Sequence, residues 1–143
     1  AQESRGLGDV YKRQVPDTAV EVNGSHDELA QVFSNLVENA IKYAGGGERI
    51  ILGIRPVPKM QSTVEAFVQD FGRGIPAEHV PRLTERFYRV EEGKAAKADG
   101  TGLGLSIVRN ILQRHNTRLL IQSRPGEGST FAMRFPSMAK NRT

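Results

Sequence analysis

The sequence predicts an α/β (α+β) two-layer sandwich, in which a mixed, largely antiparallel sheet carries helices on one face. Three observations favour this fold class. Two stretches repeat apolar residues at steps of three and four, which is typical of amphipathic helices. Two pairs of short apolar runs are each joined by a turn, which predicts two hairpins. The chain has 143 residues, which suits one domain with a substantial core.

The first part of the chain is expected to hold a short strand and a long helix. Residues 1–14 show neither the helical nor the strand periodicity and are interpreted as a linker, a frayed end or sequence foreign to the domain. Residues 18–24 alternate and predict a short strand. Ser25 suits an N-cap, and Glu28 completes a capping box at the start of an amphipathic helix. Its apolar stripe comprises Leu29, Val32, Phe33, Leu36, Val37, Ala40 and Ile41, and Gly45, Gly46 and Gly47 end the helix.

The rest of the chain is expected to supply most of the sheet. Strands are joined into hairpins, and a small, polar, flexible segment suggests a mobile lid. The expected elements are strands at 49–55 and 62–70, a short helix at 75–83, the lid at 91–105, a helix at 106–115, and strands at 118–123 and 129–136.

The composition excludes several classes of protein. The chain is 38% hydrophobic and 25% charged, with a net charge of +4 and dispersed basic residues, so no nucleic-acid patch is expected. No apolar run approaches the roughly 18 residues that a membrane span needs. With no cysteine, disulfides and thiolate metal sites are excluded.

Asn35, Asn39 and Lys42 lie on neighbouring turns of one face of the long helix, beside its apolar stripe. An Asn oxygen is a hard neutral ligand that suits magnesium, and a lysine can offset phosphate charge. The pattern therefore indicates a metal–phosphate site. The alternative is an ordinary polar helix face with a surface lysine.

The sequence Asp70-Phe-Gly72-Arg-Gly74 follows an apolar strand. A carboxylate there can accept a hydrogen bond from an amino group, and glycines let a flat ring approach the backbone. The alternative is a capped turn. The Asp-Phe-Gly tripeptide does not indicate a eukaryotic-type protein kinase, because the other signatures of that class are missing and the chain is too short for two lobes.

Gly100, Gly102 and Gly104 precede the second helix. Glycine-rich backbone leading into a helix N-terminus can bind an anion, since free N–H groups point at it. The spacing is neither the dinucleotide fingerprint nor a P-loop. A flexible linker is the alternative.

The stretches "NLVENAIKY", "DFGRGIP", "ERFYRV", "GTGLGLSIV" and "GEGSTFAMRFP" occur in that order. Together they resemble the N box, first glycine box, F box, second glycine box and closing glycine turn of the histidine kinase catalytic and ATP-binding domain. The resemblance covers residues 18–136 and is strongest to sensor kinases of the phosphate-regulon type. It implies the Bergerat ATP-binding fold, with residues 1–17 as a linker or foreign segment and 137–143 as a tail.

The resemblance also implies roles for individual residues. Asp70 accepts from the amino group of adenine, Gly72 and Gly74 shape the base pocket, and Asn39 binds Mg2+. The other implied nucleotide contacts are Asn35 and Lys42 at the phosphates, Tyr43 at the base or ribose, Gly102, Leu103, Gly104 and Leu105 around the phosphates, and Thr130 near adenine. Arg86 and Arg89 of the F box, with Lys42, are the expected catalytic cations, Arg89 being preferred, and Phe87 is expected to anchor the lid by packing.

The partners implied are ATP with Mg2+, a histidine-bearing dimerisation domain of the same kinase, and indirectly a response regulator. His26-Asp27 imitates the phosphoacceptor motif, but Ala30 and Gln31 depart from it, so the acceptor is expected outside this chain. The chain is thus interpreted as a fragment that does not phosphorylate itself. It is expected to act in the cytoplasm as part of a protein anchored in the bacterial inner membrane.

Three alternative functions stay open. Gyrase-like and chaperone ATPases share this fold but carry a glutamate at the position of Asn35. Because an amide cannot act as a general base, ATP hydrolysis as the main activity is disfavoured. Anti-sigma-factor serine kinases share the fold, although "ERFYR" favours the histidine kinase branch. An inactive nucleotide-binding interaction module is the third alternative.

Overall fold

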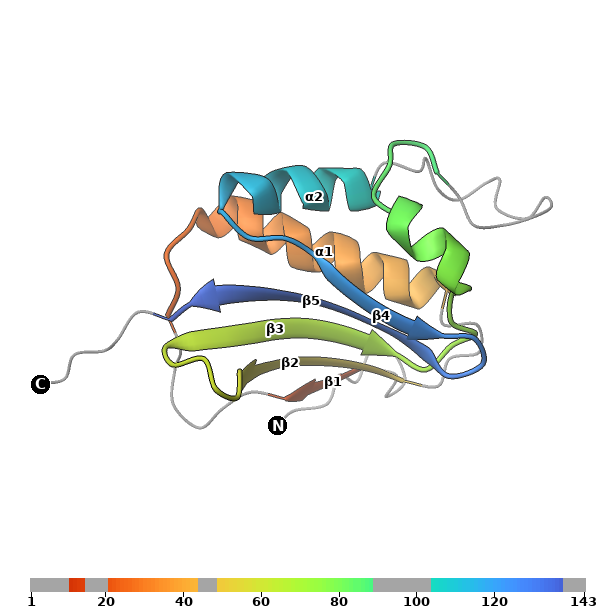
Figure 1. Cartoon of the computed structure of the whole chain (residues 1–143), viewed down its shortest axis with the longest axis horizontal. Coiled ribbons are helices and arrows are strands. Elements are labelled where there is room, and N and C mark those ends of the chain that lie inside the picture. Colours follow the sequence, from red (N-terminus) through yellow and green to blue (C-terminus); the bar gives the residue numbers. More distant parts are fainter. Residues whose placement is uncertain (1–10, 15–20, 44–48, 89–103, 138–143) are drawn as a thin grey trace, which may run out of the picture.

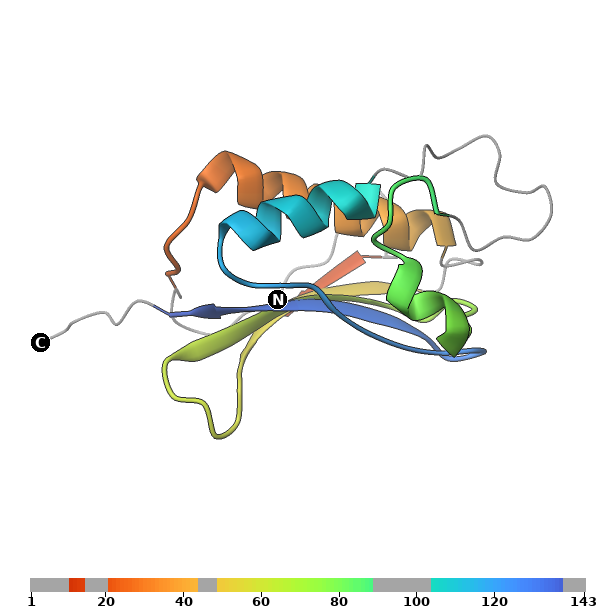
Figure 2. The same ribbon diagram turned by 45° about the horizontal axis from the view of Figure 1, so that its top comes forward.

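The computed structural model describes residues 11–14, 21–43, 49–88 and 104–137 of the chain. Within them, helices cover one face of a five-stranded sheet (Figures 1 and 2). The elements are β1 (Tyr11–Gln14), α1 (His26–Tyr43), β2 (Ile50–Pro56), β3 (Thr63–Asp70), the 3-10 helix η1 (Ala77–Arg82), α2 (Gly104–Arg114), β4 (Leu120–Arg124) and β5 (Gly128–Pro136).

The strand order in the sheet is β1-β2-β3-β5-β4. Among the described strands, only the β1–β2 pair is parallel; β2–β3, β3–β5 and β5–β4 are antiparallel. The predicted fold class and both predicted hairpins are therefore confirmed. The expectation that residues 1–14 form no strand is wrong for Tyr11–Gln14, which pair in register with Ile50–Gly53.

The core lies between the sheet and the two helices. Side chains at alternate positions of β3 and β5 face the helices, and Val68, Phe131 and Met133 among them are at most 2% exposed. On the helix side, Leu36 and Leu112 are at most 1% exposed. This burial confirms the apolar stripe predicted for α1 except at Ile41, which is 49% exposed. Burying each large apolar side chain stabilises the domain by about 1.5–3 kcal/mol.

The two helices run antiparallel and are tied at the start of α1. Ser25 caps the helix, since its Oγ accepts from the Glu28 N–H at 3.2 Å. The other half of the predicted capping box is wrong: the Ser25 N–H donates to His115 Nε2 at 3.0 Å, and Glu28 pairs with Arg114 at 2.8 Å. Both of these contacts connect the start of α1 to the end of α2. The predicted strand at 18–24 is, in its described part, one bridge between Val22 and Ser137.

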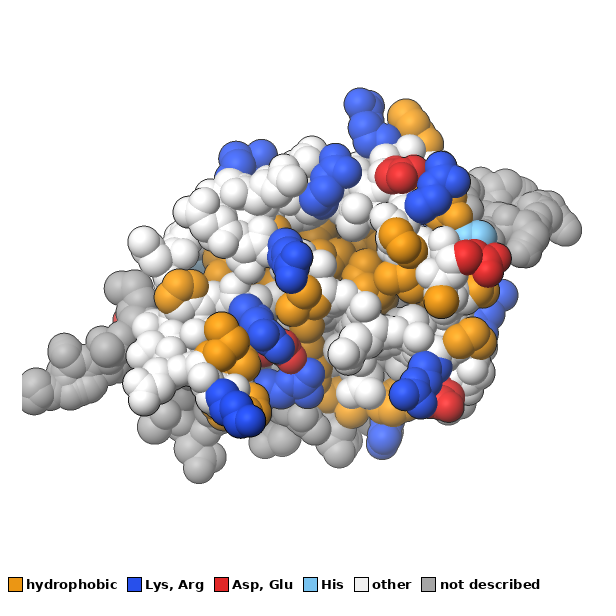
Figure 3. Space-filling model, viewed as in Figure 1, with side chains coloured by type: hydrophobic (Ala, Val, Ile, Leu, Met, Phe, Trp, Pro, Cys, Tyr) orange, Lys and Arg blue, Asp and Glu red, His pale blue; other side chains and the backbone are white. Residues whose placement is uncertain are grey.

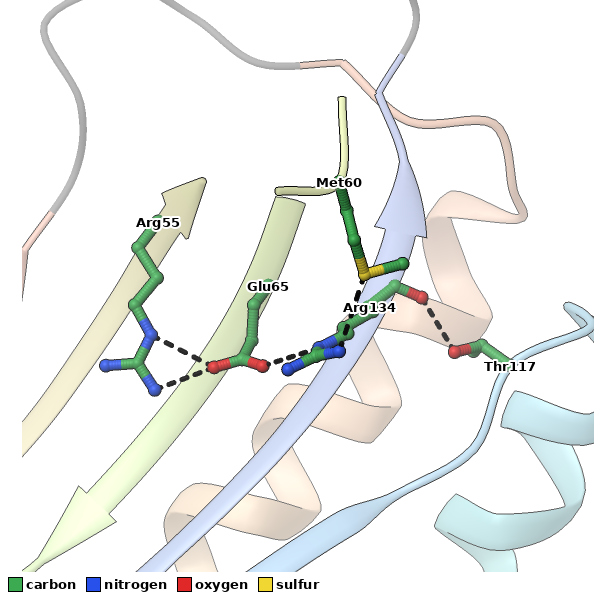
Figure 4. Close-up of polar contacts among 5 residues, drawn as sticks. All are labelled: Arg55, Met60, Glu65, Thr117 and Arg134. Atoms are coloured by element: carbon green, nitrogen blue, oxygen red, sulfur yellow. Dashed lines mark hydrogen bonds and ion pairs between the residues drawn. The ribbon is translucent and has the colours of Figure 1, made fainter. Parts of the chain in front are cut away.

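The face of the sheet opposite the helices carries an ion-pair network (Figure 4). Glu65, 8% exposed, accepts from Arg55 at 2.7 Å and from Arg134 at 2.9 Å. Burial raises the pKa of Glu65, but the hydrogen bonds and charges of Arg134 and Arg55 outweigh it and hold that pKa below its ordinary value. The Arg55 guanidinium also lies 4.0 Å from the centre of the Phe67 ring.

Lysine and arginine side chains are spread over the face seen in Figure 3, between hydrophobic and neutral groups. The expectation that the domain binds no nucleic acid stays a prediction. Among the described residues, no helix is both long and apolar enough to cross a membrane.

Candidate functional site

Several predicted site residues lie where elements meet at one end of the molecule. The C-terminal end of α1, the end of β3, η1, the start of α2 and the β4–β5 turn all lie on the right in Figure 1. The Asn35 side-chain amide donates to the Gly104 carbonyl at 3.4 Å, which joins α1 to the first turn of α2. The fold thus brings together the N box, the first glycine box and the end of the second glycine box.

Asn35, Asn39 and Lys42 lie along one face of α1, next to the fully buried Leu36 and Ala40. Both asparagines are half-buried, whereas Lys42 is exposed. The described residues contain no cluster of three or more His, Asp or Glu side chains that could cage a metal. A single amide oxygen such as that of Asn39 still fits Mg2+, because this ion keeps waters and takes its other ligands from substrate phosphates.

Asp70 ends β3 and is 5% exposed. Its Oδ1 accepts from the Gly72 N–H at 2.9 Å, and the Ser129 N–H also bonds the carboxylate. Burial raises the pKa of Asp70 above its ordinary value, and these two hydrogen bonds lower it by less. A carboxyl with a raised pKa favours the fold at low pH, and that contribution is lost as pH rises through the folded-state pKa. Such groups cluster at functional sites, which supports a binding role for Asp70.

The register of β5 identifies a site residue that sequence reasoning missed. Ser129, 5% exposed, pairs with Asp70, whereas Thr130 pairs with Gln69 and with Gln122. Because side chains alternate along a strand, Ser129 and not Thr130 shares the face of Asp70. The signal was the two-residue period that links position 129 to the buried Phe131. The role given to Thr130 stays a prediction.

The first glycine box packs backbone against backbone on the β4–β5 turn. Gly74 has a φ of +77°, and a Cβ built on it would lie 2.1 Å from the Arg124 carbonyl oxygen. A Cβ on Gly128, at φ +112°, would lie 2.1 Å from the Asp70 carbonyl oxygen. The Gly126 N–H donates to the Arg73 carbonyl at 2.7 Å. The glycines are therefore required because two turns approach too closely for any side chain.

An open cavity of about 610 Å³ lies beside Asp70. Its floor comes from the ends of β3, β4 and β5, and one wall from η1. The lining residues are Gln69, Asp70, Ala77, Val80, Pro81, Ile121, Gln122, Ser123, Arg124, Glu127, Gly128, Ser129 and Thr130. Two carboxylates and three hydroxyls beside four apolar side chains suit a flat ligand that carries hydrogen-bond donors.

The F box segment follows η1 and is held by side chains outside the motif. The Arg109 guanidinium on α2 donates to the Thr84 carbonyl at 3.2 Å. His79 of η1 hydrogen-bonds the Tyr88 hydroxyl, and the Arg82 guanidinium lies 4.5 Å from the centre of the Tyr88 ring. These contacts hold the backbone on both sides of Arg86 in place, and they were not expected from the sequence.

Phe87 does not pack as expected. Its side chain is 62% exposed, its φ is +66°, and the exposed Arg86 guanidinium lies 5.3 Å from its ring centre. Several further predictions lie outside the described residues, namely those for Arg89, Gly102, Leu103 and the lid up to residue 103. Tyr43 is described only as the last residue of α1.

His26 lies at the first position of α1 with its side chain 94% exposed. The helix has 18 residues, so His26 is roughly 25 Å from the end that carries Asn39 and Lys42. This separation agrees with the interpretation that His26 is not the acceptor for a phosphoryl group held at that end.

Comparison with known proteins gives the family. Residues 24–139 match the family model described as histidine kinase-, DNA gyrase B-, and HSP90-like ATPase. The phosphate regulon sensor protein PhoR of Pseudomonas aeruginosa is 50% identical over 117 residues, which are 82% of this chain and 26% of the relative. The sensor histidine kinase YkoH of Bacillus subtilis is 37% identical over 133 residues, 90% of this chain and 28% of the relative.

The catalytic domain of the histidine kinase ThkA, solved without nucleotide, superposes with a TM-score of 0.74 at 26% identity, covering 92% of this chain and 81% of that structure. The predicted resemblance to phosphate-regulon-type sensor kinases is thus confirmed. Since the curated relatives are about three to four times longer than the matched part, this chain corresponds to one portion of such proteins. The chain belongs to the family of histidine kinase-, gyrase B- and HSP90-like ATPases, as a catalytic domain of the histidine kinase type.

Proposed function

We propose that this domain binds ATP with Mg2+ and transfers the γ-phosphoryl group to a histidine on the dimerisation domain of its own kinase. The observation that carries the proposal is the buried Asp70, which lines the 610 Å³ cavity. One of its oxygens already accepts from Gly72, and remaining lone pairs are available to the adenine amino group. Guanine would present a carbonyl oxygen there, so Asp70 selects adenine.

Residues of α1 act on the triphosphate. Asn39 would hold Mg2+ through its side-chain oxygen, and the metal would neutralise charge on the phosphate oxygens. Lys42 acts on phosphate directly. Asn35 also faces the phosphates, next to Gly104 at the start of α2. The N–H groups in the first turn of α2, at Gly104 and Leu105, favour an anion.

The transfer is a direct displacement. An imidazole nitrogen of the partner domain attacks the γ-phosphorus, an N–P bond forms, and the bond to the bridging oxygen breaks, so that ADP leaves with the electron pair. The proton of the attacking imidazole passes to solvent. Arg89 and Arg86 stabilise charge on the phosphoryl group in flight. Asn35 cannot act as a general base toward water, which disfavours rapid hydrolysis.

The whole kinase is proposed to pass the phosphoryl group on to a response regulator and to hold this domain on the cytoplasmic side of the bacterial inner membrane. The support is the identity with much longer sensor kinases.

Radiolabelled ATP tests the proposal. The domain is incubated alone and then with the histidine-bearing hairpin of the same kinase supplied as a separate chain. Label is expected on the hairpin histidine, in an acid-labile bond, and not on the domain alone. Label on the domain alone that His26→Ala removes would contradict it, and fast phosphate release without any hairpin would favour an ATPase.

A further inference from the structure

Ser123 of β4 connects three segments of the site through one hydroxyl. It accepts from the Ile75 N–H at 2.8 Å, lies 3.1 Å from the Gly128 carbonyl oxygen, and lies 2.8 Å from the Ser129 hydroxyl. We propose that Ser123 is a positioning residue that sets the choice of nucleotide base by holding Asp70 in place. This inference rests on the proposed function, in which Asp70 selects adenine.

The three contacts use the whole hydrogen-bonding capacity of the hydroxyl, which has one proton and two lone pairs. If the Ser123 hydroxyl donates to the Gly128 carbonyl, it accepts from the Ile75 N–H and from the Ser129 hydroxyl. Every partner is then satisfied, and the hydroxyl has no freedom to rotate. A half-buried group with all its bonds made fixes the relative position of the segments that it joins.

Each of the three segments touches Asp70 or its turn. Ile75 directly follows Gly74 of the turn after Asp70. The Gly128 backbone lies against the Asp70 carbonyl, and the Ser129 N–H bonds the Asp70 carboxylate. The turns themselves meet through glycines, which have no side chains to lock the contact. Ser123 therefore acts on base recognition through Asp70 and Ser129.

The experiment compares nucleotide preference. ATP and GTP compete against a fluorescent ATP analogue on wild type, Ser123→Ala, Ser123→Thr and the control Thr117→Val. Thr117 donates to the Arg134 carbonyl at 2.7 Å, at the far end of β5, so its loss removes a comparable hydroxyl outside the site (Figure 4). Thermal unfolding of each variant checks the fold.

We expect Ser123→Ala to lower the ratio of ATP affinity to GTP affinity by about tenfold, the effect of about one hydrogen bond. Ser123→Thr keeps the hydroxyl and should restore the ratio, and Thr117→Val should not alter it. If Ser123 only stabilised the fold, its removal would lower the affinity for ATP and for GTP equally. If Ser123→Ala does not fold, Ser123→Cys, with its weaker hydrogen bonds, should lower the ratio in the same direction.

The outcomes separate this inference from the proposed function. A wild-type domain that fails to bind ATP refutes the proposed function itself. A wild type that prefers ATP while Ser123→Ala, or Ser123→Cys in its place, keeps the same ratio refutes the role of Ser123 alone. A wild type that binds both nucleotides equally refutes base selection by Asp70 and with it this inference.

Discussion

Replacing Gly74 with alanine tests the close approach of the two turns that frame the site. Gly74 has a φ of +77°, and the new Cβ would meet the Arg124 carbonyl oxygen at 2.1 Å, whereas real Cβ contacts are longer than 3.0 Å. That carbonyl accepts from the Glu127 N–H at 2.9 Å, so pushing it away weakens the turn and the adjoining bond from Gly126 to Arg73. The strained φ costs about 1 kcal/mol, and two weakened hydrogen bonds cost about 1 kcal/mol each.

Gly126→Ala is the matched control. Its φ of +85° carries the same backbone strain, but nothing lies within 4 Å of the added Cβ. Urea unfolding should therefore show a loss of about 3 kcal/mol for Gly74→Ala and about 1 kcal/mol for Gly126→Ala. ATP affinity should fall for Gly74→Ala and change little for the control. Equal losses of stability in the two variants would refute the backbone contact and the explanation of the first glycine box that rests on it.

Three other variants test separate parts of the account. Asp70→Asn should weaken ATP binding by about 1–3 kcal/mol with the fold intact by circular dichroism, because a donor would face the adenine amino group; unchanged affinity would contradict base recognition. Asn39→Asp should alter the magnesium dependence of ATP binding, whereas Lys42→Ala should weaken binding with or without the metal; an unaltered dependence would exclude Asn39 as a ligand. Glu65→Gln should lower the free energy of unfolding by about 1–2 kcal/mol at pH 7; the effect is modest because solvent screens its half-exposed arginine partners. The pKa of Glu65 is lowered from its ordinary value of 4.5, so its contribution is present above that value and is lost as pH falls through the folded-state pKa, where the gap to wild type should close; a gap that stays constant as the carboxyl is titrated would be inconsistent with the network.

The helices and hairpins could be predicted because each carries its own periodic signal. The stripe from Val32 to Ala40 is buried, and the alternation in β3 and β5 places every second side chain in the core. The motif at Asp70 could also be recognised from the sequence, since a carboxylate followed by two glycines at the end of a strand is a local pattern. In these cases the information lies within a few residues.

What the sequence did not reveal depends on partners distant along the chain. Tyr11–Gln14 form a strand because β2 offers an edge for parallel pairing. The capping box is incomplete because His115, 90 residues away, takes the Ser25 N–H. The two-residue period from Phe131 marks Ser129 as facing inward, but its place opposite Asp70 depends on the pairing of β5 with β3, which are distant along the chain.

The most direct test of the central claim, that ATP binds at the end of the sheet marked by Asp70, is an amide NMR titration of the domain with a non-hydrolysable ATP analogue and Mg2+. The largest shifts are expected at Asn39, Asp70, Gly72 and Ser129, with little change along the ion-pair network around Glu65. Shifts centred on Glu65, on the helix-free face of the sheet, with Asp70 unaffected would contradict the account.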